Sequence, residues 1–394
     1  QATVDGKGTT FNKEAHHKLA RKAAEESIVL LKNEEQILPL KQGTKVAVIG
    51  DFAKTPRYQG AGSSLVNPAM PPESILEEIK DSGLTMTACE QGYIRNRKPN
   101  AKMVKAAVEA AKNADVVLFF GGLDEISESE GLDRAHMHMP VAQDELINEL
   151  TTVNKNVIVV LSAGSSVEMP WYPYVKGIVH GYLGGQAGAS AMLNVLTGKV
   201  CPSGKLNETY PLHYEDTPAY EYYPSKERSS EYREGLYVGY RYYTTVGKKV
   251  RFPFGFGLSY TTFTYRDLTV DPEGVKFKIQ NTGTVAGTEI AQLYVGKESD
   301  SVFRPLRELK GFARVELAPG EEKEVKILFD DKTFRFYDTR TDSWEVETGT
   351  YQIMIGSNAE EMLLEGSLAV NGTVTEGGYS REELPEYFSG EIKN

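Results

Sequence analysis

The sequence predicts a doubly wound, mostly parallel α/β sheet with helices on both faces, followed by an all-β sandwich. In the first half, short apolar runs alternate with stretches of helical spacing, which is typical of a parallel sheet covered by helices. In the second half, short segments alternate apolar and polar residues between Asn-Thr-Gly and Ala-Pro-Gly turns, which indicates a sandwich. The 394 residues also exceed the usual size of one domain.

The α/β domain is expected over residues 35–213. A leading segment, 1–34, precedes it, and apolar residues at helical spacing predict an amphipathic helix from Asn12 to Leu31. The predicted strands are the apolar runs at residues 45–50, 84–88, 116–120, 157–161 and 177–180. The predicted helices are those at residues 73–80, 102–111, 140–150 and 184–196.

The second half begins with a change of composition. Residues 214–258 are rich in Tyr, Glu, Arg and Ser without apolar periodicity, and we expect a linker that wraps the surface. The sandwich is expected over residues 259–371, and its clearest strands are 275–279, 288–295, 322–329 and 349–355. Residues 372–394 carry few core-forming side chains, so we expect an extended tail.

Composition and charge exclude several classes of partner. A net charge of -11 argues against nucleic acid and anionic membranes, and no apolar run approaches the length of a membrane span. Two cysteines, Cys89 and Cys201, are too few for a disulfide framework, which fits a reducing, cytoplasmic location. The chain begins with Gln1 rather than Met, so the sequence leaves open whether it is a processed product or part of something longer.

The stretch Gly121 to Arg134 is the strongest candidate for chemistry, because it packs six charged side chains into fourteen positions directly after the apolar run 115–120. Loops that follow the carboxyl ends of parallel strands are where open α/β sheets carry ligands. The first four acids of this stretch repel one another. We therefore expect at least one of them to have a raised pKa, as a general acid needs. These acids are Asp124, Glu125, Glu128 and Glu130. The alternative is a solvated acidic loop.

Three further groups of residues contain side chains that are typical of ligand sites. Arg57, Tyr58 and Gln59 open a loop of small residues that suits a polyhydroxylated ligand, the alternative being a flexible connection. The glycines of residues 181–188 match neither the dinucleotide-binding nor the P-loop pattern, so we expect no nucleotide cofactor there. The histidines lack the partners of a metal site, and we place them on the surface. They are His16, His17, His136 and His138.

Several motifs in a fixed order carry a resemblance that covers nearly the whole chain. The motifs are His17–Asn33 with Leu38–Leu40, Glu130–Arg134, Gly184–Gly188, Pro202–Leu206, Glu234–Tyr242, Phe252–Tyr260 and Arg304–Phe312. With these motifs the sequence resembles the two C-terminal domains of a glycoside hydrolase family 3 enzyme of β-glucosidase type. The resemblance implies an α/β sandwich domain followed by a fibronectin type III-like domain, in agreement with the periodicity.

The resemblance also implies the chemistry. In that family a barrel of (β/α)8 type carries the nucleophilic aspartate, and a loop of the α/β domain carries the general acid/base. The Glu-Gly-x-Asp-Arg pattern places the acid/base at Glu130, with Glu128 as the alternative, and this chain has no barrel. We expect Arg57, Tyr58 and Gln59 to bind sugar, and Asp133 with Arg134 to form a charge pair that supports the loop.

The expected activity is that of a retaining, exo-acting β-glycosidase, which needs two carboxyl groups roughly 5 Å apart. Without the barrel we expect the chain alone to be inactive, and the expected partners are a β-glycoside or oligosaccharide and a barrel domain in the same or a second chain. No metal or organic cofactor is implied. The alternative is a stand-alone carbohydrate-binding or scaffolding module. The sugar, the linkage, the position of the barrel and the oligomeric state, including a homo-oligomer, stay open.

Overall fold

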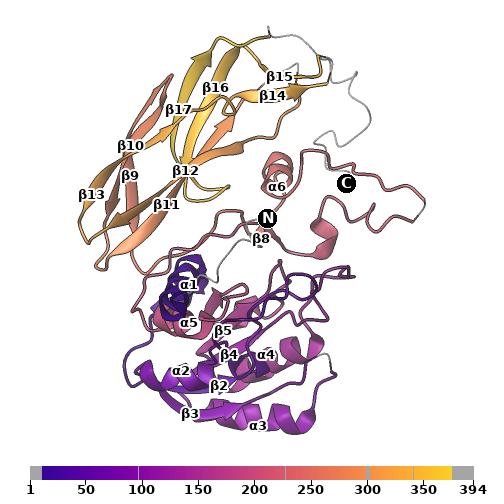
Figure 1. The fold of residues 1–394 in the computed structure, drawn as a ribbon, viewed down its shortest axis with the longest axis vertical. Coiled ribbons are helices and arrows are strands. Elements are labelled where there is room, and N and C mark those ends of the chain that lie inside the picture. Colours follow the sequence, from indigo (N-terminus) through magenta and orange to yellow (C-terminus); the bar gives the residue numbers. More distant parts are fainter. Residues whose placement is uncertain (1–10, 96, 227, 299–301, 340, 375–394) are drawn as a thin grey trace. The chain divides into compact units, whose positions relative to one another are not determined.

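The computed structural model describes residues 11–95, 97–226, 228–298, 302–339 and 341–374 (Figure 1). The chain divides into two compact units. The first comprises Gln1–Ala135, Met139–Gly164 and Pro170–Val200, and the second comprises His136–His138, Ser165–Met169 and Cys201–Asn394. The tail predicted over residues 372–394 lies almost entirely outside the described residues.

A six-stranded sheet forms the centre of the first unit. Its order is β1-β6-β5-β4-β2-β3, and all neighbours are parallel except β1, which pairs antiparallel with β6. The strands are β1 (Val29–Asn33), β2 (Lys45–Ile49), β3 (Thr85–Glu90), β4 (Val116–Gly122), β5 (Val157–Ser162) and β6 (Gly177–His180). Every residue of β4 is buried, as expected of a central strand with helices on both faces.

Two groups of helices cover this sheet. Helices α3 (Ala101–Lys112) and α4 (Val141–Val153) pack together, and α1 (Lys13–Ser27) and α2 (Ile75–Glu78) pack against α5 (Gly188–Leu196). The chain moves outward from β2 to β3 through α2 and returns past β2 to β4 through α3, so right-handed crossovers place these two helices on opposite faces. The predicted doubly wound, mostly parallel sheet is confirmed.

The first helix is shorter than predicted. It ends at Ser27 with Ile28 as its C-cap, and the residues from Val29 to Leu31 enter the edge strand β1 instead of continuing the helix. All four are buried. Four consecutive apolar residues cannot share one face of a helix, whereas a strand that is covered on both faces buries them all.

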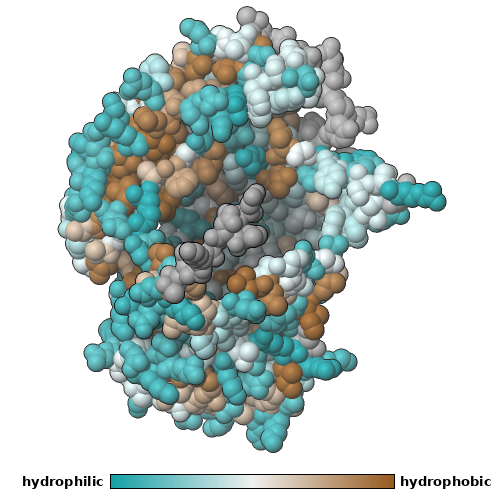
Figure 2. Space-filling view, in the orientation of Figure 1, coloured by the Kyte–Doolittle hydropathy of each residue, from teal (hydrophilic) through white to brown (hydrophobic). Residues whose placement is uncertain are grey.

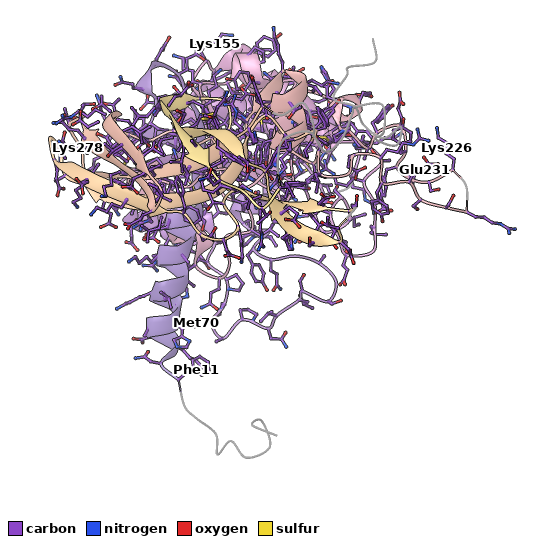
Figure 3. The ribbon with its side chains drawn as sticks, turned by 90° about the horizontal axis from the view of Figure 1, so that it is seen from above. Phe11, Met70, Lys155, Lys226, Glu231 and Lys278 are labelled. Atoms are coloured by element: carbon purple, nitrogen blue, oxygen red, sulfur yellow. The ribbon has the colours of Figure 1, made fainter. Side chains whose placement is uncertain are left out.

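A buried carboxylate fastens α1 to the sheet domain. Glu73 Oε1 lies 2.8 Å from Nε2 of His17 and accepts a hydrogen bond from Arg21 at 3.0 Å. Its second oxygen accepts the backbone N–H of Ser190 in α5 at 2.9 Å. His17 was predicted on the surface, and this prediction is wrong, because the imidazole is held between Glu73 and Gln186. Figure 3 shows α1 with Phe11 at its start, on the same side as the loop that carries Met70.

The second unit contains the predicted sandwich. One sheet has the order β13-β10-β9, the other has the order β12-β11-β16-β17, and all pairs are antiparallel. The strands are β9 (Phe263–Asp271), β10 (Gly274–Asn281), β11 (Gly287–Gly296), β12 (Glu308–Leu317), β13 (Glu322–Leu328), β16 (Gly349–Gly356) and β17 (Met362–Val370). Phe277, Leu293 and Ile353 lie in one buried cluster between the sheets.

Smaller elements complete the second unit. They are the strand pairs β7 (Tyr210–Pro211) with β8 (Val250–Phe252) and β14 (Arg335–Asp338) with β15 (Ser343–Val346), and helix α6 (Tyr240–Val246). The sequence predicts a linker without regular elements over residues 214–258, and α6 and β8 correct that prediction. Tyr240 and Tyr243, three residues apart, are both buried, and Tyr240 packs with Tyr294 and Met354. This aromatic packing stabilises a helix too short to form by itself.

Candidate active site

The acidic loop begins where β4 ends, and its first acid shapes the loop. Asp124 is only 1% exposed, and its Oδ1 accepts the backbone N–H groups of Ile126 at 3.2 Å and Ser127 at 2.8 Å. A buried aspartate that bonds the backbone two and three residues onward is a turn-forming residue. Asp124 therefore has a structural role.

The next two acids also have partners that hold the loop. Glu125 forms an ion pair with Arg95 at 3.0 Å. Glu128 accepts the backbone N–H of Gly164, which follows β5, at 2.8 Å. The carboxylates of Glu125 and Glu128 thus bond to different parts of the chain, Arg95 and Gly164, and this keeps their charges apart.

Glu130 is exposed and lies against a second loop. Its Oε2 accepts the backbone N–H of Ser63 at 2.5 Å and also the Ser63 hydroxyl, while its own N–H donates to Ala61 O at 3.1 Å. These hydrogen bonds from Ser63 hold the pKa of Glu130 below its ordinary value, and the bond from the Ser63 hydroxyl has the larger effect. The sequence predicts a raised pKa for at least one of the four acids of this loop, and Glu130 is not that acid in this structure.

A pocket of about 570 Å³ lies between the two loops and within the first unit. Both candidate glutamates line it, together with small residues and the first residue of the predicted sugar loop. The lining includes Arg57, Ser63, Ser64, Glu128, Glu130, Gly164 and Leu183. The structure therefore brings Arg57 together with Glu128 and Glu130 in one hollow.

The predicted sugar-binding residues do not all face this hollow in the same way. Arg57 is buried, and its guanidinium donates to the backbone carbonyls of Gln59 and Glu128, the latter at 2.9 Å. The side chain of Gln59 donates to the Tyr58 hydroxyl at 2.8 Å and accepts from Val66 N–H at 3.0 Å. Arg57 thus holds both loops, and sugar binding by these three residues stays a prediction.

Asp133 and Arg134 follow at the end of the loop. Asp133 is exposed and Arg134 is partly buried. The charge pair predicted between them stays a prediction. Across the described ranges no three His, Cys, Asp or Glu side chains form a group that would hold a metal ion. In those same ranges no helix is long and apolar enough to cross a membrane.

Gly62 provides a test of how closely the two loops meet. Its φ is +100°, and an added Cβ would lie 2.5 Å from Cβ of Glu130. We expect Gly62→Ala to lower the free energy of unfolding by about 1–3 kcal/mol, through backbone strain and overpacking. The matched control is Gly131→Ala, because Gly131 has a φ of +75° but no atom within 4 Å of an added Cβ. Denaturant unfolding of both variants should show the larger loss for Gly62→Ala, and equal losses would contradict the close contact.

Sequence reasoning missed the partner of Glu130. Ser63 was only one of several small residues in the loop after Arg57, and nothing in its spacing linked it to a residue 67 positions later. The two loops follow β2 and β4, which are neighbours in the sheet. Loops at the carboxyl ends of adjacent parallel strands meet at one edge, and this rule was the signal available.

Fold and pocket define the protein's class: an α/β domain that presents a glutamate-bearing loop, followed by an antiparallel sandwich. The model of the glycosyl hydrolase family 3 C-terminal domain matches residues 28–260, and that of the fibronectin type III-like domain matches residues 289–359. The chain belongs to glycosyl hydrolase family 3.

Relatives agree with this assignment. Thermostable beta-glucosidase B of Acetivibrio thermocellus is 46% identical over 375 residues, which cover 92% of this chain and 50% of that protein. An exo-alpha-(1->6)-L-arabinopyranosidase of Bifidobacterium breve is 41% identical over 378 residues, which cover 92% of this chain and 50% of that protein. The crystal structure of a Bifidobacterium adolescentis GH3 beta-glucosidase matches with a TM-score of 0.90 and 40% identity, covering 94% of this chain and 56% of that one. The chain thus spans about half the length of the curated relatives it matches.

Proposed function

We propose that this chain is the acid/base-bearing part of a retaining, exo-acting β-glycosidase of β-glucosidase type, with Glu130 as general acid/base. The observation that carries the proposal is the exposed Glu130 carboxyl at the pocket, on the loop after β4 and within the matched family range. Glu128 also lines the pocket, but its carboxylate accepts the Gly164 N–H. Both carboxylates accept a backbone N–H, but Glu128 is half-buried and Glu130 is exposed, and this difference favours Glu130 as the proton donor.

The proposed reaction needs a second carboxylate. In a retaining mechanism one carboxyl group protonates the leaving oxygen while a carboxylate roughly 5 Å away attacks the anomeric carbon. We propose that an aspartate of a barrel domain, in the same or another chain, supplies this nucleophile. The coverage of only half of each relative supports a missing partner domain. Without it we expect the chain alone to be inactive.

The protonation of Glu130 follows from the same arrangement. In the chain described here, hydrogen bonds from Ser63 lower the pKa of Glu130, which is the opposite of what a general acid needs. A nearby ionised nucleophile would raise it, because two like charges at short distance disfavour ionisation of both. The proposed barrel carboxylate would therefore also convert Glu130 into an acid that is protonated near neutral pH.

Exposed hydrophobic residues support a domain that covers this region. Leu65 and Val66 follow Ser63 closely in the chain, and Ile126 and Leu132 lie within the acidic loop. All four side chains are more than half exposed. Figure 2 shows hydrophobic patches that interrupt the hydrophilic surface of the first unit. Adjacent exposed apolar side chains around a pocket are typical of a surface that binds a partner.

The substrate class is proposed as terminal β-linked sugars, and the choice of sugar stays open. Relatives of similar identity carry the names beta-glucosidase and exo-alpha-(1->6)-L-arabinopyranosidase. We further propose a cytoplasmic location, which the two free cysteines, Cys89 and Cys201, support.

Hydrolysis by the chain alone and by the longer protein that contains it tests the proposal. We expect aryl β-glucoside or β-xyloside to be hydrolysed by the longer protein and not by this chain. Mass spectrometry of the protein purified from its source should show a mass well above the chain's 43.6 kDa, or a second chain that supplies a barrel. A purified protein of about 43.6 kDa that binds oligosaccharides but hydrolyses neither glycoside would instead establish the stand-alone binding module.

A further inference from the structure

Two donors from one residue meet a single oxygen of Glu130. The backbone N–H and the hydroxyl of Ser63 both donate to Oε2. The backbones of the two loops are also joined, because the Glu130 N–H donates to Ala61 O at 3.1 Å. The segment from Ala61 to Ser63 therefore holds Glu130 through both its side chain and its main chain.

Neighbouring residues hold the Ser63 donors against Glu130. Gly62 adopts a φ of +100°, which turns the chain so that Ser63 follows directly beneath the glutamate, and any side chain at Gly62 would collide with Glu130. The buried Arg57 guanidinium bonds carbonyls of both loops, at Gln59 and Glu128. The Ser63 donors are thus fixed by the scaffold.

We infer that Ser63 is a positioning residue that holds the ionised Glu130 carboxylate and sets the pH range in which Glu130 exchanges its proton. Hydrogen bonds to the charged form of a carboxyl group favour that form, and two on one oxygen do so strongly. This inference rests on the proposed function, because it gives Ser63 a part in the reaction only if Glu130 is the acid/base.

Ser63 bonds one of the two carboxyl oxygens of Glu130, Oε2. The proton that passes to the leaving oxygen in the first step must lie on the other oxygen, Oε1, because a proton shared with Ser63 would point away from the substrate. The Ser63 hydroxyl and N–H therefore donate to Oε2 both when Glu130 is protonated and when it is ionised and removes a proton from water in the second step. Ser63 thus accommodates both protonation states without moving the glutamate.

Titration of Glu130 in this chain tests the inference without any need for catalysis. We would follow the side-chain carboxyl carbon of 13C-labelled glutamate by NMR, with assignment from Glu130→Gln. In the wild type we expect a midpoint below that of an ordinary glutamate, and in Ser63→Ala an upward shift. An unchanged midpoint in Ser63→Ala would overturn the inference.

Two control variants separate this effect from damage to the loop. Ser63→Thr keeps the hydroxyl at an exposed position and should retain the low midpoint. Ser64→Ala removes a neighbouring pocket hydroxyl that, in the described ranges, does not bond to Glu130, and it should leave the midpoint unchanged. A shift in Ser64→Ala as large as in Ser63→Ala would contradict a specific role for Ser63.

Kinetics of the barrel-containing protein then distinguish this inference from the proposed function. The alkaline limb of kcat/KM reports the acid of the free enzyme, so Ser63→Ala should move that limb to higher pH and Ser63→Thr should restore it. A shifted NMR midpoint with an unmoved limb would overturn Glu130 as the acid and with it the proposed function. An unshifted midpoint together with a lost proton donor in Glu130→Gln would overturn only the role of Ser63.

Discussion

Glu130→Gln in the barrel-containing protein is expected to slow hydrolysis of substrates with poor leaving groups by about 10²–10⁴-fold, the usual contribution of a positioned general acid. Activated aryl glycosides should lose far less, because their leaving groups depart without protonation. The change keeps the shape of the side chain and removes the transferable proton. Steady-state rates on an alkyl β-glucoside and on a nitrophenyl β-glucoside measure the difference directly.

Glu128→Gln is the matched control. It is the alternative acid, two residues away and in the same pocket, but its carboxylate accepts the Gly164 N–H and so fixes the loop. We expect both kinds of substrate to be affected to a similar, smaller extent. If Glu128→Gln rather than Glu130→Gln shows the dependence on the leaving group, the acid/base is Glu128. Equal losses on both substrates in Glu130→Gln would contradict the assignment.

The second large effect is expected at the anchor of α1. Glu73→Ala removes a carboxylate that is only 8% exposed and leaves His17 and Arg21 without their shared partner. We expect a loss of about 2–4 kcal/mol in the free energy of unfolding, as is usual when one member of a buried charged pair is removed. Glu26→Gln on the same helix, whose exposed pair with Lys22 spans 3.8 Å, should cost less than about 1 kcal/mol. A loss at Glu73 no greater than at Glu26 would contradict the anchor.

The same carboxylate makes stability depend on pH. Burial by itself raises the pKa of Glu73, but hydrogen bonds from Ser190, His17 and Arg21 outweigh burial, and the pKa lies below its ordinary value. A lowered pKa in the folded state gives stability that is complete above the unfolded pKa, about 4.3, and is lost as the pH falls through the folded value. Urea unfolding at pH 7 and at pH 3.5 should show a smaller acid-induced loss in Glu73→Gln than in the wild type.

Much of the fold could be predicted because its signals are local. The runs that became β4 and β5 are largely apolar and almost fully buried, and the segment that became β13 alternates in both sequence and burial, so each pattern indicates one kind of burial. The errors arose where tertiary contacts decide. The residues after Ser27 continue a helical pattern but pair with β6, and α6 depends on the packing of Tyr240 against Tyr294.

The site was predictable only in part, for the same physical reason. The position of the acidic loop after β4 follows from the rule for parallel sheets, and the resemblance selects Glu130 within it. The direction in which the pKa of Glu130 shifts was not predictable, because this shift depends on Ser63, which is far away in sequence, and not on the neighbouring acids. Burial of Arg57 also depends on contacts between loops that spacing does not reveal.

Rescue by azide of the barrel-containing Glu130→Gly variant would test the central claim most directly. Without its base, the glycosyl-enzyme of a retaining enzyme accumulates, and a small anion that needs no deprotonation attacks the anomeric carbon in place of water. We expect azide to accelerate steady-state release of nitrophenol from a nitrophenyl β-glucoside by Glu130→Gly, because azide displaces the enzyme carboxylate from the accumulated glycosyl-enzyme. The product should be the β-glycosyl azide, with no such effect in the wild type or in Glu128→Gly. Formation of the azide product by Glu128→Gly alone, or by neither variant, would contradict Glu130 as the general acid/base.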